Sequence, residues 1–378
     1  MKKTRNVNFE IMRILSMLFI IIWHILLWGK VTENCKNPAI SLILNFINCI
    51  IMVHVNSFIL LSGYFQSKSK IKISKIFKLL LQVVFYIFIM LIIAIKVGWI
   101  TDYNIVTFMD NVLPSSVNKY WFIRCYLLMY ILSDYLNFFI SKMDQKKYKG
   151  FIMVSFLIMS ILPFISGFKI LSDPSYTFYF FIFLYFLGGY LRRYSIKDSY
   201  HFKNMSIKGY RLLMIIIFIS CAIINHIMLY YSNNVAELSN LFSNIASRLR
   251  INYASSFTII QTIAYFEIFK SFDFSIKDKL NKLIIKVSSS VFGIYLIHEN
   301  PFIRQHLYIL LGIDNGEFYG YTKILYVFVF AVIIFIGACI IELLRQLLFY
   351  LLSKIPIIKK IILCLKKYIL SFNFNLNW

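Results

Sequence analysis

The first long apolar stretch of the chain contains Arg13 and His24, ionisable residues whose spacing allows them to act together. On an α-helix this separation corresponds to three turns plus about 20°, so both side chains lie on one face, about 16 Å apart along the axis. A guanidinium can bind an anion through several donors, and an imidazole can act as a general base near neutral pH. The alternatives are an arginine that extends to the lipid headgroups and a histidine that is hydrogen-bonded in the core. Because ionisable side chains are costly in a membrane, two of them on one face favour a function.

The second apolar stretch adds His54 near its middle and the Ser62-Gly63 pair near its end. A serine next to a glycine lets two backbones approach closely, so this pair is typical of helix packing as well as of a binding site. His54 is either a structural histidine or part of a path that substrates follow. Tyr295 and His298, in a later apolar stretch, are candidates for the same path.

Arg124 and Glu299 are further ionisable side chains that lie in apolar segments. Arg124 follows an aromatic pair typical of the membrane interface, and at its greater depth it needs a partner. Glu299 directly follows His298, and adjacent residues are about 100° apart on a helix, so we do not expect these two to pair with each other. Pro301 should kink this segment and free backbone carbonyls for other partners.

A run of lysines begins directly after the second apolar stretch. It consists of Lys68, Lys70, Lys72, Lys75 and Lys78. Several cations beside a close-approach site would suit a polyphosphate. The alternative is a solvated cytoplasmic loop, because loops on that side of a membrane are rich in lysine.

The composition predicts the elements that position these residues. Of the 378 residues, 60% are hydrophobic and 15% are charged. Soluble domains contain roughly 45–50% apolar and about 25% charged residues, so the fold class is an all-α polytopic membrane protein, and disordered, collagen-like and coiled-coil classes are excluded. A membrane helix needs about 20 mostly apolar residues. Segments of this kind occur at 9–28, 40–65, 76–95, 120–140, 150–167, 175–191, 211–231, 251–270, 286–311 and 321–349.

The distribution of the net charge of +24 predicts the topology. With a cytoplasmic N-terminus, 29 of the 40 Lys and Arg residues fall on the cytoplasmic side and 8 on the outer side. This asymmetry follows the positive-inside rule, so we expect about ten transmembrane helices with both termini cytoplasmic, and the charge requires no nucleic acid. Residues 1–350 would form the membrane domain. Residues 351–378 would form a basic tail, either an amphipathic interfacial helix or a frayed end.

Four sequence elements together resemble the membrane acyltransferase-3 family. They are the Arg13-x10-His24 pairing, Ser62-Gly63-Tyr64, Trp121-Phe122 and the segment 293–298. The resemblance covers the whole chain, including the number of helices. Lysines follow the Ser-Gly element where many members carry arginines, and lysine binds phosphate as a point charge. No esterase-like domain follows the last segment, so we expect a stand-alone form.

The resemblance implies an O-acyltransferase that moves an acyl group, usually acetyl, from cytoplasmic acyl-CoA to a sugar hydroxyl of an envelope or capsular polysaccharide. The donor phosphates would lie near Arg13 and the lysine run. His24 would act as a general base or would carry the acyl group in an intermediate. The expected partners are acyl-CoA, a lipid-linked or polymeric glycan, and the lipids of a bacterial-type plasma membrane. We expect no permanently bound cofactor and no metal, because the six cysteines include no C-x-x-C pair.

Three other functions fit a polytopic membrane protein. A transporter or flippase for lipid-linked sugars would need no acyl-CoA and often shows repeated halves, which this sequence lacks. A glycan polymerase should carry a large charged outer loop, whereas the longest outer stretches, 96–119 and 232–250, are modest. A structural subunit would leave the alignment of Arg13 with His24 unexplained.

Overall fold

The computed structural model describes residues 6–100, 120–166, 174–235, 251–274, 276–312, 320–356 and 360, and this part of the chain contains helices and no strand. The predicted all-α class is therefore confirmed. The helices are α1 (Val7–Trp28), α2 (Pro38–Ile51), α3 (His54–Gln66), α4 (Ile73–Lys96), α7 (Trp121–Ile131), α8 (Ser133–Lys142), α9 (Gln145–Phe156), the π-helical η1 (Leu157–Ile161), α10 (Leu162–Ser166), the 3-10 turn η2 (Pro174–Tyr176), α11 (Phe178–Arg193), α12 (Ile207–Val235), α14 (Ser256–Ser271), α15 (Asp278–Ser288), α16 (Val291–His298), α17 (Arg304–Leu310) and α18 (Thr322–Leu352).

Within the described residues, 7 helical stretches are long and apolar enough to cross a membrane. The pair α7 and α8 adds one more if it is counted as a single span bent by 54°. Two further predicted segments coincide with α11 and α14, which have only 16 residues each. The count of ten spans and the cytoplasmic location of both termini therefore stay predictions. Most of the proposed basic tail lies outside the described residues.

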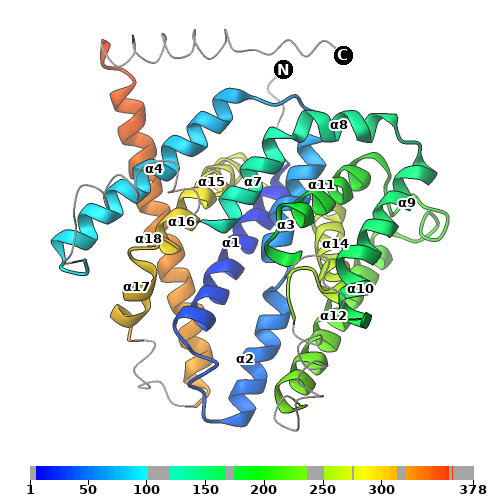
Figure 1. Cartoon of the computed structure of the whole chain (residues 1–378), viewed down its shortest axis with the longest axis horizontal. Coiled ribbons are helices and arrows are strands. Elements are labelled where there is room, and N and C mark those ends of the chain that lie inside the picture. The colour runs from blue at the N-terminus through cyan, green and yellow to red at the C-terminus, as the bar shows by residue number, and fades with distance from the viewer. Residues whose placement is uncertain are drawn as a thin grey trace.

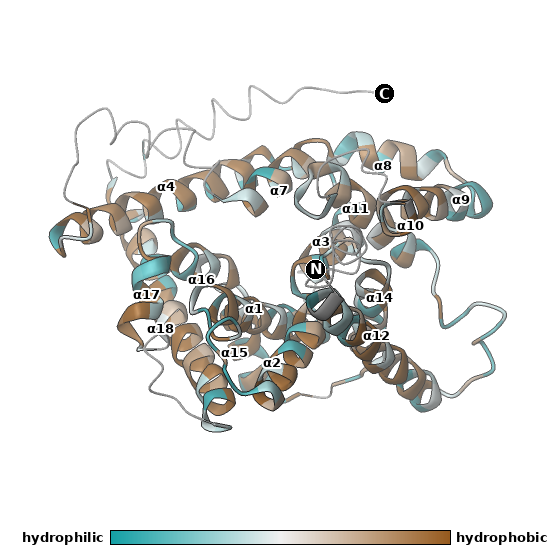
Figure 2. Ribbon diagram, turned by 60° about the horizontal axis from the view of Figure 1, so that its bottom comes forward, coloured by the Kyte–Doolittle hydropathy of each residue, from teal (hydrophilic) through white to brown (hydrophobic). Residues whose placement is uncertain are grey.

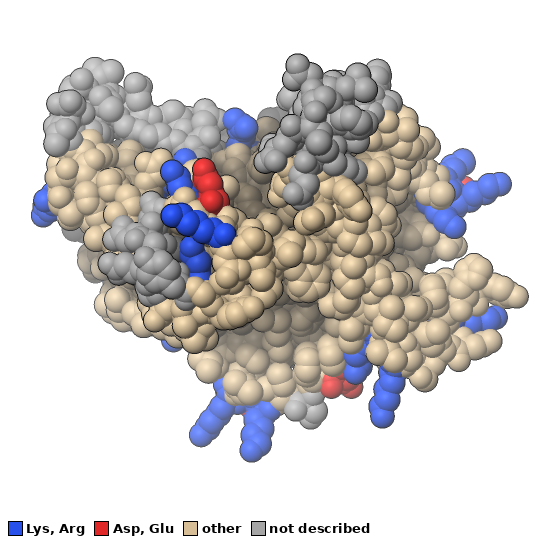
Figure 3. Space-filling model, turned by 90° about the horizontal axis from the view of Figure 1, so that it is seen from below, with Lys and Arg blue, Asp and Glu red and all other residues tan. Residues whose placement is uncertain are grey.

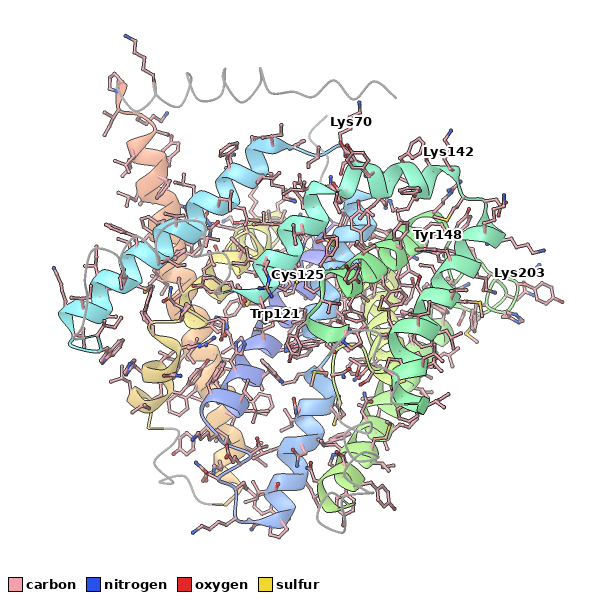
Figure 4. The ribbon with its side chains drawn as sticks, viewed as in Figure 1. Lys70, Trp121, Cys125, Lys142, Tyr148 and Lys203 are labelled. Atoms are coloured by element: carbon pink, nitrogen blue, oxygen red, sulfur yellow. The ribbon has the colours of Figure 1, made fainter. Side chains whose placement is uncertain are left out.

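Helix α1 lies in the middle of the bundle (Figure 1). It packs against α2, α3, α14, α15, α16, α17 and α18. The start of α1 and the end of α18 lie on the same side of the molecule, at the top of Figure 1. Lys70 and Lys142 point away from the bundle on this side (Figure 4), which corresponds to the side predicted to be cytoplasmic. Because α1 is surrounded by other helices, its ionisable residues face protein rather than lipid.

The outward faces of the bundle are apolar, as Figure 2 shows for helices such as α4, α12 and α18. Large apolar side chains such as Leu81, Ile216 and Leu344 are more than half exposed there. Surfaces of this kind suit contact with lipid rather than with water. Seen from the bottom of Figure 1, the molecule presents mostly neutral side chains, with one group of cations around an acidic side chain and others at the edges (Figure 3).

Helices α3 and α11 are in close backbone contact through their glycines. A Cβ atom on Gly63 would clash with the carbonyl of Tyr185, and one on Gly188 would clash with the carbonyl of Leu60. Only glycine permits such an approach. The close packing predicted from Ser62-Gly63 is therefore confirmed, and its partner is α11. This contact also brings Arg192, near the end of α11, next to α3.

Candidate active site

His24, near the end of α1, contacts two consecutive residues at the end of α16. Its Nδ1 lies 3.1 Å from Nε2 of His298, and its Nε2 lies 3.3 Å from a carboxylate oxygen of Glu299. All three side chains are buried. His298 and Glu299 are thus not partners of each other, as their helical offset predicts. They flank one imidazole that lies 274 residues before His298 in the chain.

The hydrogen bonds indicate which nitrogen of each imidazole carries the proton. Nδ1 of His298 lies 2.6 Å from the carbonyl oxygen of Ile294, which can only accept, so Nδ1 is the donor. In a neutral His298, Nε2 then accepts a hydrogen bond from Nδ1 of His24. The lone pair of a neutral His24 is therefore on Nε2, beside Glu299. This nitrogen can take up a proton, and the carboxylate of Glu299 would stabilise the resulting imidazolium.

Glu299 is itself held by two further residues. Its carboxylate accepts hydrogen bonds from Arg304 at 2.8 Å and from the indole nitrogen of Trp28 at 3.2 Å. The guanidinium of Arg304 also lies over the Trp28 ring, 4.5 Å from its centre. Since a buried carboxylate is costly without partners, these contacts explain how Glu299 stays beside His24.

The break that follows α16 positions this group. The helix ends at His298, before Pro301, and α17 starts at Arg304. The hydroxyl of Tyr120 donates to the freed carbonyl of Leu296 at 2.9 Å, and the side chain of Asn300 donates to the same hydroxyl at 3.0 Å. The predicted effect of Pro301, a broken helix whose carbonyls find new partners, is confirmed.

A second buried ionic group fixes α16 from its other side. Glu342 on α18 accepts hydrogen bonds from Tyr86 at 2.6 Å and from Arg345 at 2.7 and 2.8 Å. Gly293 on α16 lies directly against this carboxylate, and any larger residue there would clash with it. Helix α16 is therefore held between α1 and the α4–α18 pair.

Arg13 lies toward the other end of α1, and its charge is paired. It donates to one carboxylate oxygen of Glu10 at 2.6 Å, and Ser288 donates to the other oxygen. Ser288, the last residue of α15, contacts Glu10 near the start of α1. His298, the last residue of α16, contacts His24 near the end of α1. Helix α1 and the α15–α16 stretch therefore run in the same direction, as the alternation of the first and ninth predicted segments requires.

One cavity of about 780 Å³ is lined by both Arg13 and His24. This volume is typical of a ligand-binding site. The cations among its described lining residues are Arg13, Lys75, Lys78 and Arg192. Glu10 is the acidic residue among the described lining residues.

The other cations of the cavity lie toward Arg13 rather than toward His24. Arg192 donates to the hydroxyl of Tyr64 at 3.1 Å, and the Tyr64 ring packs against Phe9, one turn before Arg13, at 5.3 Å. Lys75 is in the first turn of α4, directly after the loop that carries Lys70. This end of the cavity is thus cationic and faces the side predicted to be cytoplasmic.

The structure brings several other predicted residues to the same cavity. His54, Ser62 and Tyr295 line it. The hydroxyl of Ser62 donates a hydrogen bond to a carbonyl of its own helix at 2.8 Å. His298 acts on the site through its contact with His24, whereas Gly63 serves the packing of α3 on α11.

The five lysines of the run do not stay together. Lys75 and Lys78 line the cavity, whereas the other three are exposed and are not among its lining residues: Lys68, Lys70 and Lys72. Lys70 points away from the bundle in Figure 4. Arg124 is also exposed and lies outside the cavity lining.

Four residues of the site were not assigned to it from the sequence. Glu10 and Glu299 are acids within apolar stretches, and the cost of an acid in a membrane is a signal that could have assigned them to the site. Trp28 resembles any interfacial tryptophan, and Arg192 resembles the other cations of a cytoplasmic loop. For these two, the sequence carries no separate signal.

The chain matches a family model described as an acyltransferase domain over residues 6–343, a range that includes every cavity-lining residue and the partners of His24. No curated protein and no solved structure matches the chain. The family match favours an enzyme over a transporter, a polymerase or a structural subunit. With its apolar helices, the chain therefore belongs to the membrane acyltransferase-3 family and is an acyltransferase.

Proposed function

We propose that this enzyme transfers an acetyl group from cytoplasmic acetyl-CoA to a sugar hydroxyl of an envelope or capsular glycan, in a bacterial-type plasma membrane. The observation that carries the proposal is a single cavity that joins a cationic end at Arg13 to the buried imidazole of His24. The glycan acceptor rests on the family resemblance and on the depth of His24 in the first segment.

The cationic end suits the phosphates of the donor. Arg13, Lys75, Lys78 and Arg192 can each contribute a charge-assisted hydrogen bond to a phosphate oxygen. Arg13 uses Nη1 for Glu10, which leaves its other donors for a ligand in the cavity. The pantetheine arm would extend along the cavity toward His24, a distance of about 16 Å along α1. The thioester would then reach the imidazole while the nucleotide stays on the cytoplasmic side.

The chemistry follows from the lone pair on Nε2 of His24. The acceptor hydroxyl would give its proton to this nitrogen while its oxygen attacks the thioester carbonyl. The carbon–sulfur bond then breaks, and the imidazolium returns the proton to the departing thiolate. His298 keeps the imidazole in the required tautomer, and Glu299 stabilises its charged form during the reaction. Glu299 is held in place for this role by its hydrogen bonds from Arg304 and Trp28.

The test measures transfer of labelled acetyl groups from acetyl-CoA to glycan in membranes that contain the full-length protein. Loss of the general base in His24→Ala should lower the rate roughly 10²- to 10⁴-fold. The matched control is His226→Ala, because His226 is also a histidine of an apolar helix but lies outside the cavity lining, against Phe46. Proton NMR of the surface polysaccharide should show acetyl signals that depend on His24. Equal transfer by wild type and a well-inserted His24→Ala variant would rule out this mechanism.

A further inference from the structure

His54 is buried at the wall of the cavity, and one of its ring nitrogens has no hydrogen-bond partner among the described residues. Its relative exposure is 0%, and it lines the same cavity as His24. Its Nδ1 lies 3.4 Å from the carbonyl oxygen of Met52, and its Nε2 has no hydrogen-bond partner within the described part of the chain. Because a buried polar atom is costly without a partner, this nitrogen needs a ligand.

Two aromatic side chains pack against this imidazole, and a third stacks on one of them. The Trp23 ring lies 5.7 Å from it and the Tyr253 ring 5.4 Å, measured between ring centres. Trp121 stacks on Tyr253 at 6.0 Å, and all three aromatic residues line the cavity. Asn56 donates to the Tyr253 carbonyl at 2.8 Å and so holds this residue against α3. We call His54 and these rings, Trp23, Trp121 and Tyr253, the aromatic cage.

The cage lies at the reactive end of the cavity rather than at its cationic end. Trp23 also packs against His24, with ring centres 5.1 Å apart, so one indole contacts both imidazoles. Along α3, His54 precedes Tyr64 by about 15 Å, and Tyr64 holds Arg192. A ligand in the cage is therefore close to His24 and remote from the proposed phosphate site.

The hydrogen bond of His54 defines what this ligand must offer. A carbonyl oxygen only accepts, so the Met52 contact places the proton of a neutral His54 on Nδ1 and the lone pair on Nε2. The free nitrogen thus needs a hydroxyl or an N–H donor, and it cannot stabilise a thioester carbonyl. Flat aromatic walls suit the C–H faces of a sugar ring, and the imidazole suits one of its hydroxyls.

We propose that the aromatic cage is the acceptor-sugar site, in which Nε2 of His54 accepts a hydrogen bond from a hydroxyl of the pyranose ring. Trp23 then places a neighbouring hydroxyl of the same ring beside His24. This inference rests on the proposed acetyl transfer and adds to it the place and the chemical class of the acceptor. His54 is a binding and positioning residue here, because it does not take the proton of the reacting hydroxyl.

The test uses purified full-length protein in lipid nanodiscs with acetyl-CoA and, as acceptor probes, the methyl pyranosides of glucose, galactose and N-acetylglucosamine. CoA release and the mass of the acetylated glycoside are measured. His54→Phe keeps an aromatic ring but loses the acceptor nitrogen, so the KM of the glycoside should rise roughly 3- to 10-fold. The KM of acetyl-CoA should stay unchanged. His54→Gln, whose amide oxygen can accept the same hydroxyl, should restore much of the loss.

A matched pair keeps the test decisive if His54→Phe does not insert into the membrane. His54→Gln and His54→Met have side chains of similar length, but only glutamine is a strong acceptor, so methionine should show the higher glycoside KM. A rise in the KM of acetyl-CoA alone would assign the cage to the pantetheine arm and overturn the proposal. The proposal would also be overturned if the wild type hydrolyses acetyl-CoA and none of the glycosides increases its rate of CoA release. A wild type that neither binds nor cleaves acetyl-CoA would instead contradict the proposed acetyl transfer itself.

Discussion

The two ends of the cavity hold their charges in different ways. At the cationic end, the Arg13 side chain is 26% exposed, and its acidic partner Glu10 lies one turn away on the same helix. At the reactive end, the side chains of His24 and Glu299 are 7% and 10% exposed and come from different parts of the chain. Partly exposed cations keep much of their hydration until a ligand binds, whereas a buried polar network depends on every member.

This difference separates binding from chemistry. The cations at Arg13, Lys75 and Arg192 can exchange water for phosphate at small cost, so they suit recognition of a soluble donor. His24 and Glu299 are fixed before any substrate arrives, which suits a proton transfer that needs a defined geometry. Substitutions at the two ends should therefore change different kinetic constants.

The strongest test of the reactive end is Glu299→Gln. The variant keeps the shape of the side chain but removes the charge that stabilises the imidazolium of His24, so kcat should fall roughly 10²- to 10⁴-fold, as in other systems with an oriented imidazole. The KM values of donor and acceptor should change little. Steady-state acetyl transfer across both substrate concentrations checks this. Glu33→Gln, at an exposed acid outside the cavity lining, is the control. An unchanged kcat with a raised acetyl-CoA KM would move Glu299 to donor binding.

The cationic end is tested by Arg13→Lys. Lysine keeps the positive charge but loses the planar fork of donors that can hold Glu10 and a phosphate together. The loss of a charge-assisted contact costs about 1.5–3 kcal/mol, which corresponds to a roughly 10- to 150-fold higher KM for acetyl-CoA. The kcat at saturating donor should be retained. Identical donor curves for wild type and the lysine variant would leave Arg13 as a membrane anchor only.

The smallest effect is expected within the lysine run. Lys75→Gln should raise the KM of acetyl-CoA roughly 2- to 5-fold at low salt, and the difference should shrink as the ionic strength rises. Lys70→Gln should have no effect, because this side chain points away from the bundle (Figure 4). Donor titrations of both variants at two salt concentrations compare them directly. Equal effects of the two substitutions would show a general electrostatic attraction instead of a site at Lys75.

Several features of the site follow from local spacing alone. Helical geometry places Arg13 and His24 on one face, and both line the observed cavity. The same geometry separates His298 from Glu299, and Pro301 ends the segment that carries them. These predictions need only neighbouring residues, because the rise and twist of a helix hardly depend on the rest of the fold.

Other features depend on contacts between distant segments. The sequence places Lys68, Lys70, Lys72 and Lys75 in one run, but only the path of the chain between α3 and α4 decides which of them reaches the cavity. Arg192 reaches it because Gly63 and Gly188 allow α11 to pack closely on α3.

The sequence by itself determined that this chain forms apolar helices, that ionisable residues recur within them, and that its motifs resemble those of one acyltransferase family. Helix formation in a membrane is a local requirement, since each segment must satisfy its own backbone hydrogen bonds. Only the tertiary structure decided that His298 and Glu299 flank His24 and that His54 lies in an aromatic cage beside it. These contacts join residues from separate helices, and their partners are selected by the packing of whole helices, which no local spacing encodes.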